Sequence, residues 1–192
     1  MSRARFVVVT GAPGSGKTTL GRLLSAELRL PFLARDDVRG GLFCTAGAWT
    51  PHPGPVPASA DASDVFLRVL ETVAALGVSY VVEYVVPAHR PADRDRLVAA
   101  ADCVAVVTEC RDPLARVARR NRADRLLNRA PVLAALGHAT IDEHTAAAVE
   151  RMGRVAATML TDLGVPTLRV ATDDGYAPGL DAIAAFATAG TR

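Results

Sequence analysis

The feature that most constrains this chain is a glycine-rich segment near its amino terminus, at residues 11–18. It reads Gly-Ala-Pro-Gly-Ser-Gly-Lys-Thr and matches the pattern G-x-x-x-x-G-K-[ST] at every fixed position. A β-branched apolar run precedes it at residues 6–10, and leucines with helical spacing follow it. A loop of this kind directs backbone N–H groups and the positive end of the helix dipole at phosphate groups. The segment therefore predicts a P-loop that binds a nucleoside triphosphate, formed by Gly11, Ala12, Pro13, Gly14, Ser15, Gly16, Lys17, Thr18 and Thr19.

The use of lysine points to the same segment. Of the 22 basic residues in the chain, only Lys17 is a lysine, so a compact ammonium is kept at one position and arginine is used everywhere else. We expect Lys17 to reach the β- and γ-phosphates and to act in catalysis, and we expect the Thr18 hydroxyl to coordinate Mg²⁺. Guanine-specific P-loop proteins normally use an N-K-x-D segment, which would need a second lysine. The expected cofactors are therefore ATP and Mg²⁺.

Short apolar runs alternate with amphipathic stretches along the rest of the chain. The runs predict strands at residues 6–10, 31–34, 78–86, 102–109 and 165–171. The amphipathic stretches predict helices at residues 18–30, 61–76, 91–100, from 113 onward, 141–163 and 180–189. In the helix at 61–76 the residues expected to face the core are Val65, Val69, Thr72 and Val73. The alternation predicts an α/β fold, the three-layer sandwich of P-loop NTPases, with a five-stranded parallel sheet between helices.

Composition bounds the class of protein. The chain has 192 residues, of which half are hydrophobic and 22% are charged, as in a globular protein with a single domain at 1–192. The net charge of +2 gives no support for membrane or bulk nucleic-acid binding. The apolar runs are too short to span a bilayer, and no apolar leader precedes the first motif. We therefore expect a cytoplasmic protein.

Arginines are concentrated after the fourth predicted strand. They are Arg111, Arg116, Arg119, Arg120, Arg122, Arg125 and Arg129. Phosphoryl transfer spreads negative charge over the transferred group, and arginines on a mobile lid stabilise that charge. We expect a helical lid at about 111–140, with Arg116 and Arg120 on ATP, Arg120 in catalysis, and Arg125 on the acceptor side. A solvated basic helix or an RNA-binding patch would have a similar composition.

The residues just past the second predicted strand are Arg35, Asp36 and Asp37. In a parallel sheet the carboxyl ends of the strands face the ligand, so a carboxylate at this point can accept a hydroxyl proton. We expect Asp36 to bind the acceptor and act as the catalytic base, and Asp37 to cap a short helix that begins at Val38. Arg39 lies in the same segment and is assigned to the acceptor side. The alternative for Asp36 is a role as helix cap only.

The third predicted strand carries an acid in an apolar run. A buried carboxylate needs a partner or a cation, so we expect Glu83 to bind Mg²⁺ or a substrate hydroxyl; the alternative is an edge glutamate that faces solvent. Arg90 follows this strand and is a candidate for the acceptor site. A Pro/Gly-rich acceptor-side loop at about 44–60 contains Trp49, which we expect to shield the acceptor hydroxyl from water.

Together these segments resemble the AAA-type P-loop kinases, which include chloramphenicol phosphotransferase-like enzymes, polynucleotide 5′-hydroxyl kinases and zeta toxins. Residues 122–130 are similar to the R-G-D-R-x-x-G-x-A stretch of the chloramphenicol phosphotransferase-like proteins, with Ala123 and Asn128 in place of the two glycines. The resemblance implies a nucleotide- or shikimate-kinase-like sheet and an arginine-rich lid. It also implies that Asp36 holds the position of the catalytic aspartate, and that Thr172 and Asp173 lie near the adenine.

The leading hypothesis is an ATP:alcohol phosphotransferase that acts on a small-molecule hydroxyl, including hydroxyls of antibiotics or other natural products. The alternatives are a kinase for nucleic-acid 5′-hydroxyls or nucleosides, and a regulatory protein that binds ATP and hydrolyses it weakly. A near-neutral charge and an aromatic content of 5% disfavour a nucleic-acid partner, because tracking a strand needs a basic groove and stacking platforms.

Overall fold

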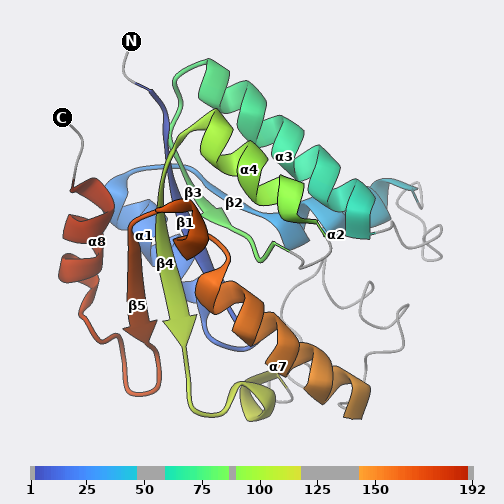
Figure 1. The fold of residues 1–192 in the computed structure, drawn as a ribbon, viewed down its shortest axis with the longest axis vertical. Coiled ribbons are helices and arrows are strands. Elements are labelled where there is room, and N and C mark those ends of the chain that lie inside the picture. The colour runs from blue at the N-terminus through green and yellow to red at the C-terminus, as the bar shows by residue number, and fades with distance from the viewer. Residues whose placement is uncertain (1–2, 47–58, 87–89, 118–142, 190–192) are drawn as a thin grey trace.

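The computed structural model of the chain describes residues 3–46, 59–86, 90–117 and 143–189. At its centre lies a five-stranded sheet in the order β2-β3-β1-β4-β5, with every neighbouring pair parallel (Figure 1). The strands are β1 (Arg5–Gly11), β2 (Phe32–Ala34), β3 (Tyr80–Glu83), β4 (Asp102–Glu109) and β5 (Thr167–Ala171). The five predicted parallel strands are therefore confirmed, although β3 is shorter than the apolar run that predicted it.

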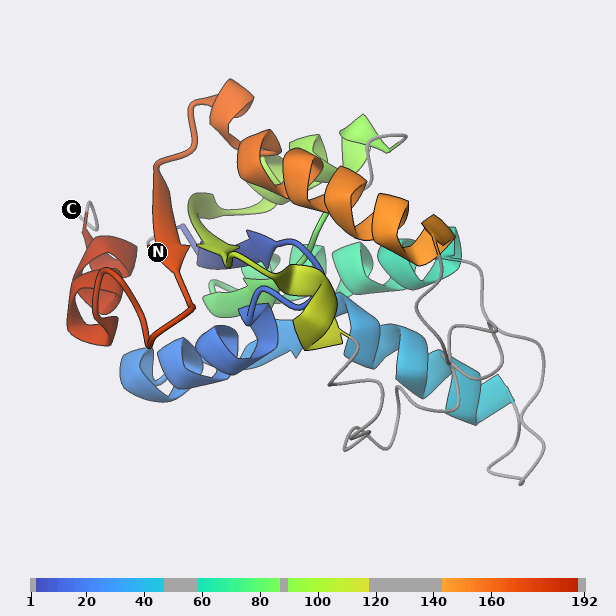
Figure 2. The same ribbon diagram turned by 90° about the horizontal axis from the view of Figure 1, so that it is seen from below.

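Helices cover both faces of the sheet, which confirms the three-layer α/β sandwich. They are α1 (Lys17–Leu28), α2 (Arg35–Ala46), α3 (Ser59–Ala75), α4 (Pro91–Ala100), α7 (Glu143–Thr158) and α8 (Leu180–Thr188), with a short 3₁₀ turn at Thr161–Leu163. Figure 2 shows the sheet between α1 on one side and α7 on the other. Among the described helices, none has both the length and the apolar character needed to cross a bilayer.

The core consists of two clusters separated by the sheet. Phe6 and Val8 of β1 point to one face, where they pack with residues of α3 and α4, and Val7 and Val9 point to the other, where they pack with Leu20 and other residues of α1 and α8. All four β1 side chains have 0% exposure. A central parallel strand is buried on both faces, which explains why this run is apolar without alternation.

The prediction for the inner face of α3 was wrong. Val65 and Val69 are 38% and 39% exposed, whereas Phe66, Leu67 and Leu70 are at most 1% exposed. Of the other two residues predicted to face the core, Thr72 is exposed and Val73 is only half-buried. The larger phenylalanine and leucine side chains remove more apolar surface from water than valines do, so the helix turns that stripe toward the core.

Two other helix boundaries differ from the predictions. Helix α2 begins at Arg35, directly after β2, so Asp36 and Asp37 both lie in its first turn and Asp37 does not cap a helix that begins at Val38. The predicted helix at 141–163 is α7 followed by the separate 3₁₀ turn.

Candidate active site

The P-loop follows β1 and closes tightly against β4 and the helical turn at residues 113–117. Gly11 and Gly14 have φ values of 148° and 85°. A Cβ atom on Gly11 would lie 2.4 Å from the Thr108 carbonyl oxygen, and one on Gly14 would lie 2.4 Å from the Pro113 carbonyl oxygen. Only glycine satisfies both the conformation and the space at these two positions, so the glycines of the motif serve the path of the loop.

Lys17 begins α1 and lies against the loop. Its Nζ atom donates a hydrogen bond to the Ala12 carbonyl oxygen at 2.8 Å, and the same oxygen accepts from the Ser15 N–H at 3.1 Å. The ammonium is thus held at the loop, beside the amino terminus of a helix whose dipole also attracts anions. Thr18, the next residue of α1, is half-buried, and Thr19 is exposed.

The register of the sheet brings the separate sequence motifs together. Ala34, Glu83 and Val9 are aligned across β2, β3 and β1. Arg35 and Asp36 follow the first of these residues, and the P-loop follows the last after Thr10. Neighbouring strands lie about 4.8 Å apart, so roughly 10 Å separates the β2 end from the β1 end, with Glu83 between them. Glu83 thus lies between the segment with Asp36 and the P-loop.

Glu83 ends β3 and is buried, with 6% of the residue exposed. The alternative of an edge glutamate facing solvent is therefore wrong. Among the described residues no group of three or more His, Cys, Asp and Glu side chains could hold a metal ion by itself. Mg²⁺ commonly binds through one or two carboxylates together with substrate phosphates, and the oxygen donors of Thr18 and Glu83 beside a P-loop fit that chemistry.

Asp36 forms an ion pair with the residue before it, Arg35. The Arg35 Nη1 atom lies 3.1 Å from the Asp36 Oδ1 atom, and the Arg35 side chain is only 12% exposed. Its Nε atom also donates to the Ser63 hydroxyl of α3 at 3.4 Å. Burial lowers the pKa of Arg39 below its ordinary value, and the nearby Arg35 guanidinium adds to that effect. Asp37 points elsewhere, with its Oδ2 atom 3.9 Å from the Arg22 Nη2 atom of α1.

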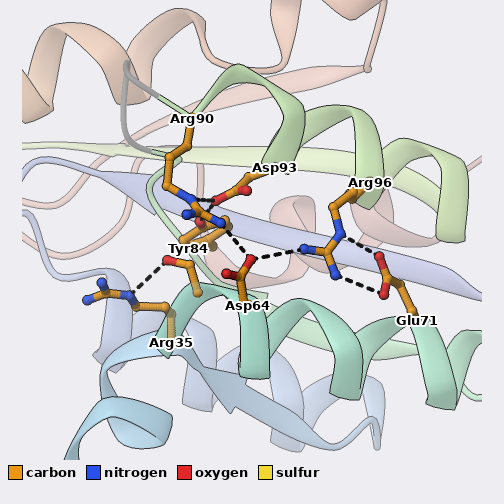
Figure 3. Close-up of polar contacts among 8 residues, drawn as sticks. Arg35, Asp64, Glu71, Tyr84, Arg90, Asp93 and Arg96 are labelled. Atoms are coloured by element: carbon orange, nitrogen blue, oxygen red, sulfur yellow. Dashed lines mark hydrogen bonds and ion pairs between the residues drawn. The ribbon is translucent and has the colours of Figure 1, made fainter. Parts of the chain in front are cut away.

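Arg90 lies in a polar network between α3 and α4 (Figure 3). Its Nε atom donates to Asp93 at 2.8 Å, and its Nη2 atom donates to Asp64 at 2.7 Å. Tyr84, the residue after Glu83, donates its hydroxyl proton to Asp93 at 2.6 Å. Burial raises the pKa of Tyr84, and the hydrogen bond to Asp93 raises it further. Arg90 is thus engaged in structural contacts, and its role toward an acceptor stays a prediction.

The same network continues along α3. Arg96 donates two hydrogen bonds to the Glu71 carboxylate, at 2.6 and 2.9 Å, and a third to Asp64 at 3.3 Å (Figure 3). The hydrogen bond from Arg96 lowers the pKa of Glu71, although partial burial opposes it. Burial alone would raise the pKa of Asp93, but the hydrogen bonds from Arg90 and Tyr84 leave it below its ordinary value. This network fixes α3 and α4 beside the end of β3.

The predicted adenine side lies at the ends of β4 and β5. Arg116, in the helical turn at 113–117, donates to the Thr172 hydroxyl at 2.9 Å and to the Thr172 carbonyl at 2.7 Å. It also lies 3.5 Å from the Asp173 carboxylate. The structure therefore brings Arg116, Thr172 and Asp173 together, and their place near the adenine stays a prediction.

Three assigned residues lie outside the described residues. They are Trp49, Arg120 and Arg125. From the sequence, Arg35 was noted beside Asp36 but given no role, and Thr108 was not singled out. These two residues contact Asp36 and the P-loop respectively. Each could have been found as a polar residue at the carboxyl end of an apolar strand, the edge at which ligands bind in parallel sheets.

Comparison with solved structures supports this fold. A protein of Chloroflexus aurantiacus described as a kinase superposes with a TM-score of 0.63 at 20% identity, over 96% of this chain and 97% of that one. A gluconokinase from Sinorhizobium meliloti matches with a TM-score of 0.48 at 18% identity, over 98% and 91% of the two chains. Shikimate kinase from Acinetobacter baumannii matches with a TM-score of 0.48 at 17% identity, over 87% and 83%. At 20% identity, the likeness to the Chloroflexus aurantiacus protein shows the fold alone.

Among curated proteins, none matches the sequence. The family model described as an AAA domain matches residues 6–139, which include the P-loop, β1 to β4 and the arginine-rich segment after β4. That match covers well over half of the 192 residues. With the kinase-like fold, it confirms the resemblance to the AAA-type P-loop kinases, and the chain belongs to the AAA domain family.

Proposed function

We propose that the protein is an ATP-dependent phosphotransferase that moves the γ-phosphoryl group of ATP onto a hydroxyl group of a small molecule. The observation that carries this proposal is the alignment of Ala34, Glu83 and Val9 across three neighbouring strands. It sets a carboxylate pair, a buried acid and a P-loop side by side at one edge of the sheet. Family and fold support a kinase-like phosphotransferase in general. The hydroxyl acceptor is our inference from the position of Asp36.

The P-loop and its lysine hold the phosphates in this proposal. Backbone N–H groups of the P-loop, which Pro13 lacks, and the Lys17 ammonium bind the β- and γ-phosphates. Thr18 and Glu83 are the residues that would hold Mg²⁺, which when bound neutralises charge on the phosphates. Lys17 lies at the loop already, with its Nζ atom 2.8 Å from the Ala12 oxygen, so it needs only a small movement of a flexible side chain to reach a phosphate.

Asp36 acts on the acceptor. Its carboxylate orients the acceptor hydroxyl and takes its proton as the hydroxyl oxygen forms a bond to the γ-phosphorus. The bond between that phosphorus and the β–γ bridging oxygen breaks, and ADP leaves with the electron pair. The residues proposed to contact the acceptor are Arg39, Arg90, Arg125 and Trp49. Arg120 is proposed to stabilise the charge on the transferred group, and Arg116 to contact ATP at its adenine end.

A small acceptor is favoured over a nucleic acid by charge. The net charge of +2 and the aromatic content of 5% give little to attract or stack a strand. A nucleoside, a nucleic-acid 5′-hydroxyl and weak hydrolysis of ATP are the competing outcomes of the test. Hydroxyl-bearing natural products, antibiotics included, are the acceptor class we propose.

The test is transfer of label from [γ-³²P]ATP. The purified chain is incubated with Mg²⁺ and with hydroxyl-bearing metabolites, antibiotics, nucleosides and a 5′-hydroxyl oligonucleotide, and products are identified by mass. We expect one class of small acceptor to gain a phosphoryl group, and Lys17→Ala to abolish the gain. Labelling of the oligonucleotide alone, or release of inorganic phosphate that no acceptor changes, would contradict the proposal.

A further inference from the structure

Thr172 joins the P-loop to the base of the predicted lid, at a point that the proposed reaction does not use. The residue follows β5 and is 8% exposed. Its hydroxyl donates to the Ser15 carbonyl oxygen of the P-loop at 2.9 Å. The same hydroxyl accepts a hydrogen bond from the Arg116 Nη1 atom at 2.9 Å. One side chain therefore links the helical turn at 113–117 to the phosphate-binding loop.

The contact with the Ser15 carbonyl determines the direction of an N–H group. The Ser15 C=O and the Gly16 N–H belong to one peptide unit, and in a planar trans peptide these two groups point in opposite directions. A hydroxyl that holds the Ser15 oxygen toward Thr172 thus turns the Gly16 N–H away from it. Gly16 is the second fixed glycine of the P-loop motif, and N–H groups of this loop bind phosphate. Thr172 therefore orients an N–H group that the motif assigns to phosphate binding.

Ser15 is also held through its side chain. Its hydroxyl lies 2.6 Å from the Thr108 hydroxyl of β4, and Thr108 donates its proton to the Thr10 carbonyl oxygen at 3.0 Å. Because that proton is used, Ser15 is the donor in its bond to Thr108. Ser15 has 0% exposure, so neither contact competes with water. The loop is thus held from β4 and from the end of β5.

Arg116 holds Thr172 at two atoms. Besides the hydroxyl, it donates from Nη2 to the Thr172 carbonyl oxygen at 2.7 Å. Since the Thr172 hydroxyl accepts from Arg116, its own proton is directed at the carbonyl oxygens of Ser15, at 2.9 Å, and Glu109, at 3.2 Å. A change at Arg116 would therefore alter the position of Thr172, and with it the hydrogen bond from Thr172 to the P-loop.

We propose that Thr172 is a positioning residue that presets the P-loop for phosphate, and that Arg116 acts through it. Contacts at the lid base and phosphate binding are then coupled, and coupling of this kind is reciprocal. The inference rests on the nucleotide-binding part of the proposed function and needs no acceptor.

The test uses a probe that has the phosphates of ATP but no adenine or ribose. Binding of magnesium tripolyphosphate and of MgATP to the full chain is measured by calorimetry. Thr172→Val removes the hydroxyl and keeps the shape, so we expect both ligands to bind roughly tenfold more weakly. Thr172→Ser keeps the hydroxyl and should bind like the wild type. Thr167→Val is the matched control, because the Thr167 hydroxyl donates to the Val165 carbonyl oxygen at 2.9 Å at the other end of β5.

Arg116→Lys tests the coupling. Lysine keeps the charge but lacks the planar guanidinium that donates to both the hydroxyl and the carbonyl oxygen of Thr172. We expect it to weaken tripolyphosphate binding in the wild-type background and to have no further effect in Thr172→Val. Unchanged tripolyphosphate binding in Thr172→Val, or an equal effect of Arg116→Lys in both backgrounds, would overturn the proposal.

If Thr172→Val fails to fold, Arg116→Lys alone decides. An arginine that contacted only the adenine of ATP would leave the binding of tripolyphosphate unchanged when replaced. The absence of transfer to any hydroxyl acceptor would overturn the proposed function and leave these binding results standing.

Discussion

The Arg35 guanidinium bonds the carboxylate of its neighbour Asp36, with 3.1 Å between Nη1 and Oδ1, while its own side chain is almost buried. Arg35 is the first residue of α2, where the helix dipole favours negative side chains and disfavours a positive one. Its Nε atom is tied to Ser63 of α3. The carboxylate is thereby attached to the helix pair α3–α4, and its position depends on more than its own helix.

We therefore predict that Arg35→Met lowers kcat by about 10- to 100-fold, the loss expected for a charge-assisted hydrogen bond, with little change in ATP affinity. Arg35→Lys should recover part of the rate. Arg22→Met is the control, since Arg22 pairs with Asp37 at 3.9 Å on the exposed surface. Steady-state kinetics with the identified acceptor checks this, and equal rates for Arg35→Met and Arg22→Met would argue against a role for Arg35.

Asp36 and Asp37 should differ in function although both lie in the first turn of α2. Asp36→Asn keeps the size of the side chain and removes the base, so kcat should fall by at least about 10²-fold with ATP affinity unchanged. Asp37→Asn should keep most of the activity and change the free energy of unfolding by less than about 1 kcal/mol, because its ion pair is exposed. If the two variants exchange these behaviours, Asp37 is the base.

Acid should weaken the network between α3 and α4. The pKa values of Asp93 and Glu71 are lowered in the folded chain. Groups of this kind stabilise the fold at pH values above the unfolded pKa, about 4, and lose that contribution as the pH falls through the lower folded values. We expect the melting temperature to fall below about pH 4, and to fall less in Asp93→Asn and Glu71→Gln, when measured by circular dichroism. Parallel curves for all three proteins would show that this network does not cause the acid sensitivity.

The sequence was sufficient for the sheet and the P-loop because both depend on local pattern. The run before Gly11 is buried on both faces and therefore apolar throughout, and the motif itself is specified position by position. The inner face of α3 was not predictable from valines alone, since two apolar stripes compete on that helix and packing against β1 selects the one with Phe66. Similarly, only the tertiary structure shows that α2 begins at Arg35.

The contacts of single residues were the least predictable. Thr108 looks like an ordinary strand-end threonine until the register places Gly11 opposite it. Thr172 was expected near the adenine, but its contact with Ser15 is visible only in the tertiary structure. Arg90 was assigned to the acceptor from its position after β3, but its ion pairs with Asp64 and Asp93 depend on how α3 packs against α4. Such contacts join residues far apart in the sequence, where no local pattern constrains them.

The most direct test of the account is γ-phosphoryl transfer by Lys17→Ala. Lys17 is the one lysine of the chain, and it contacts the P-loop rather than the core. We predict that Lys17→Ala keeps the circular dichroism spectrum and melting behaviour of the wild type and transfers no detectable label from [γ-³²P]ATP to the acceptor that the wild type modifies. A folded Lys17→Ala protein with wild-type transfer would contradict the claim that residues 11–18 bind the phosphates of the donor.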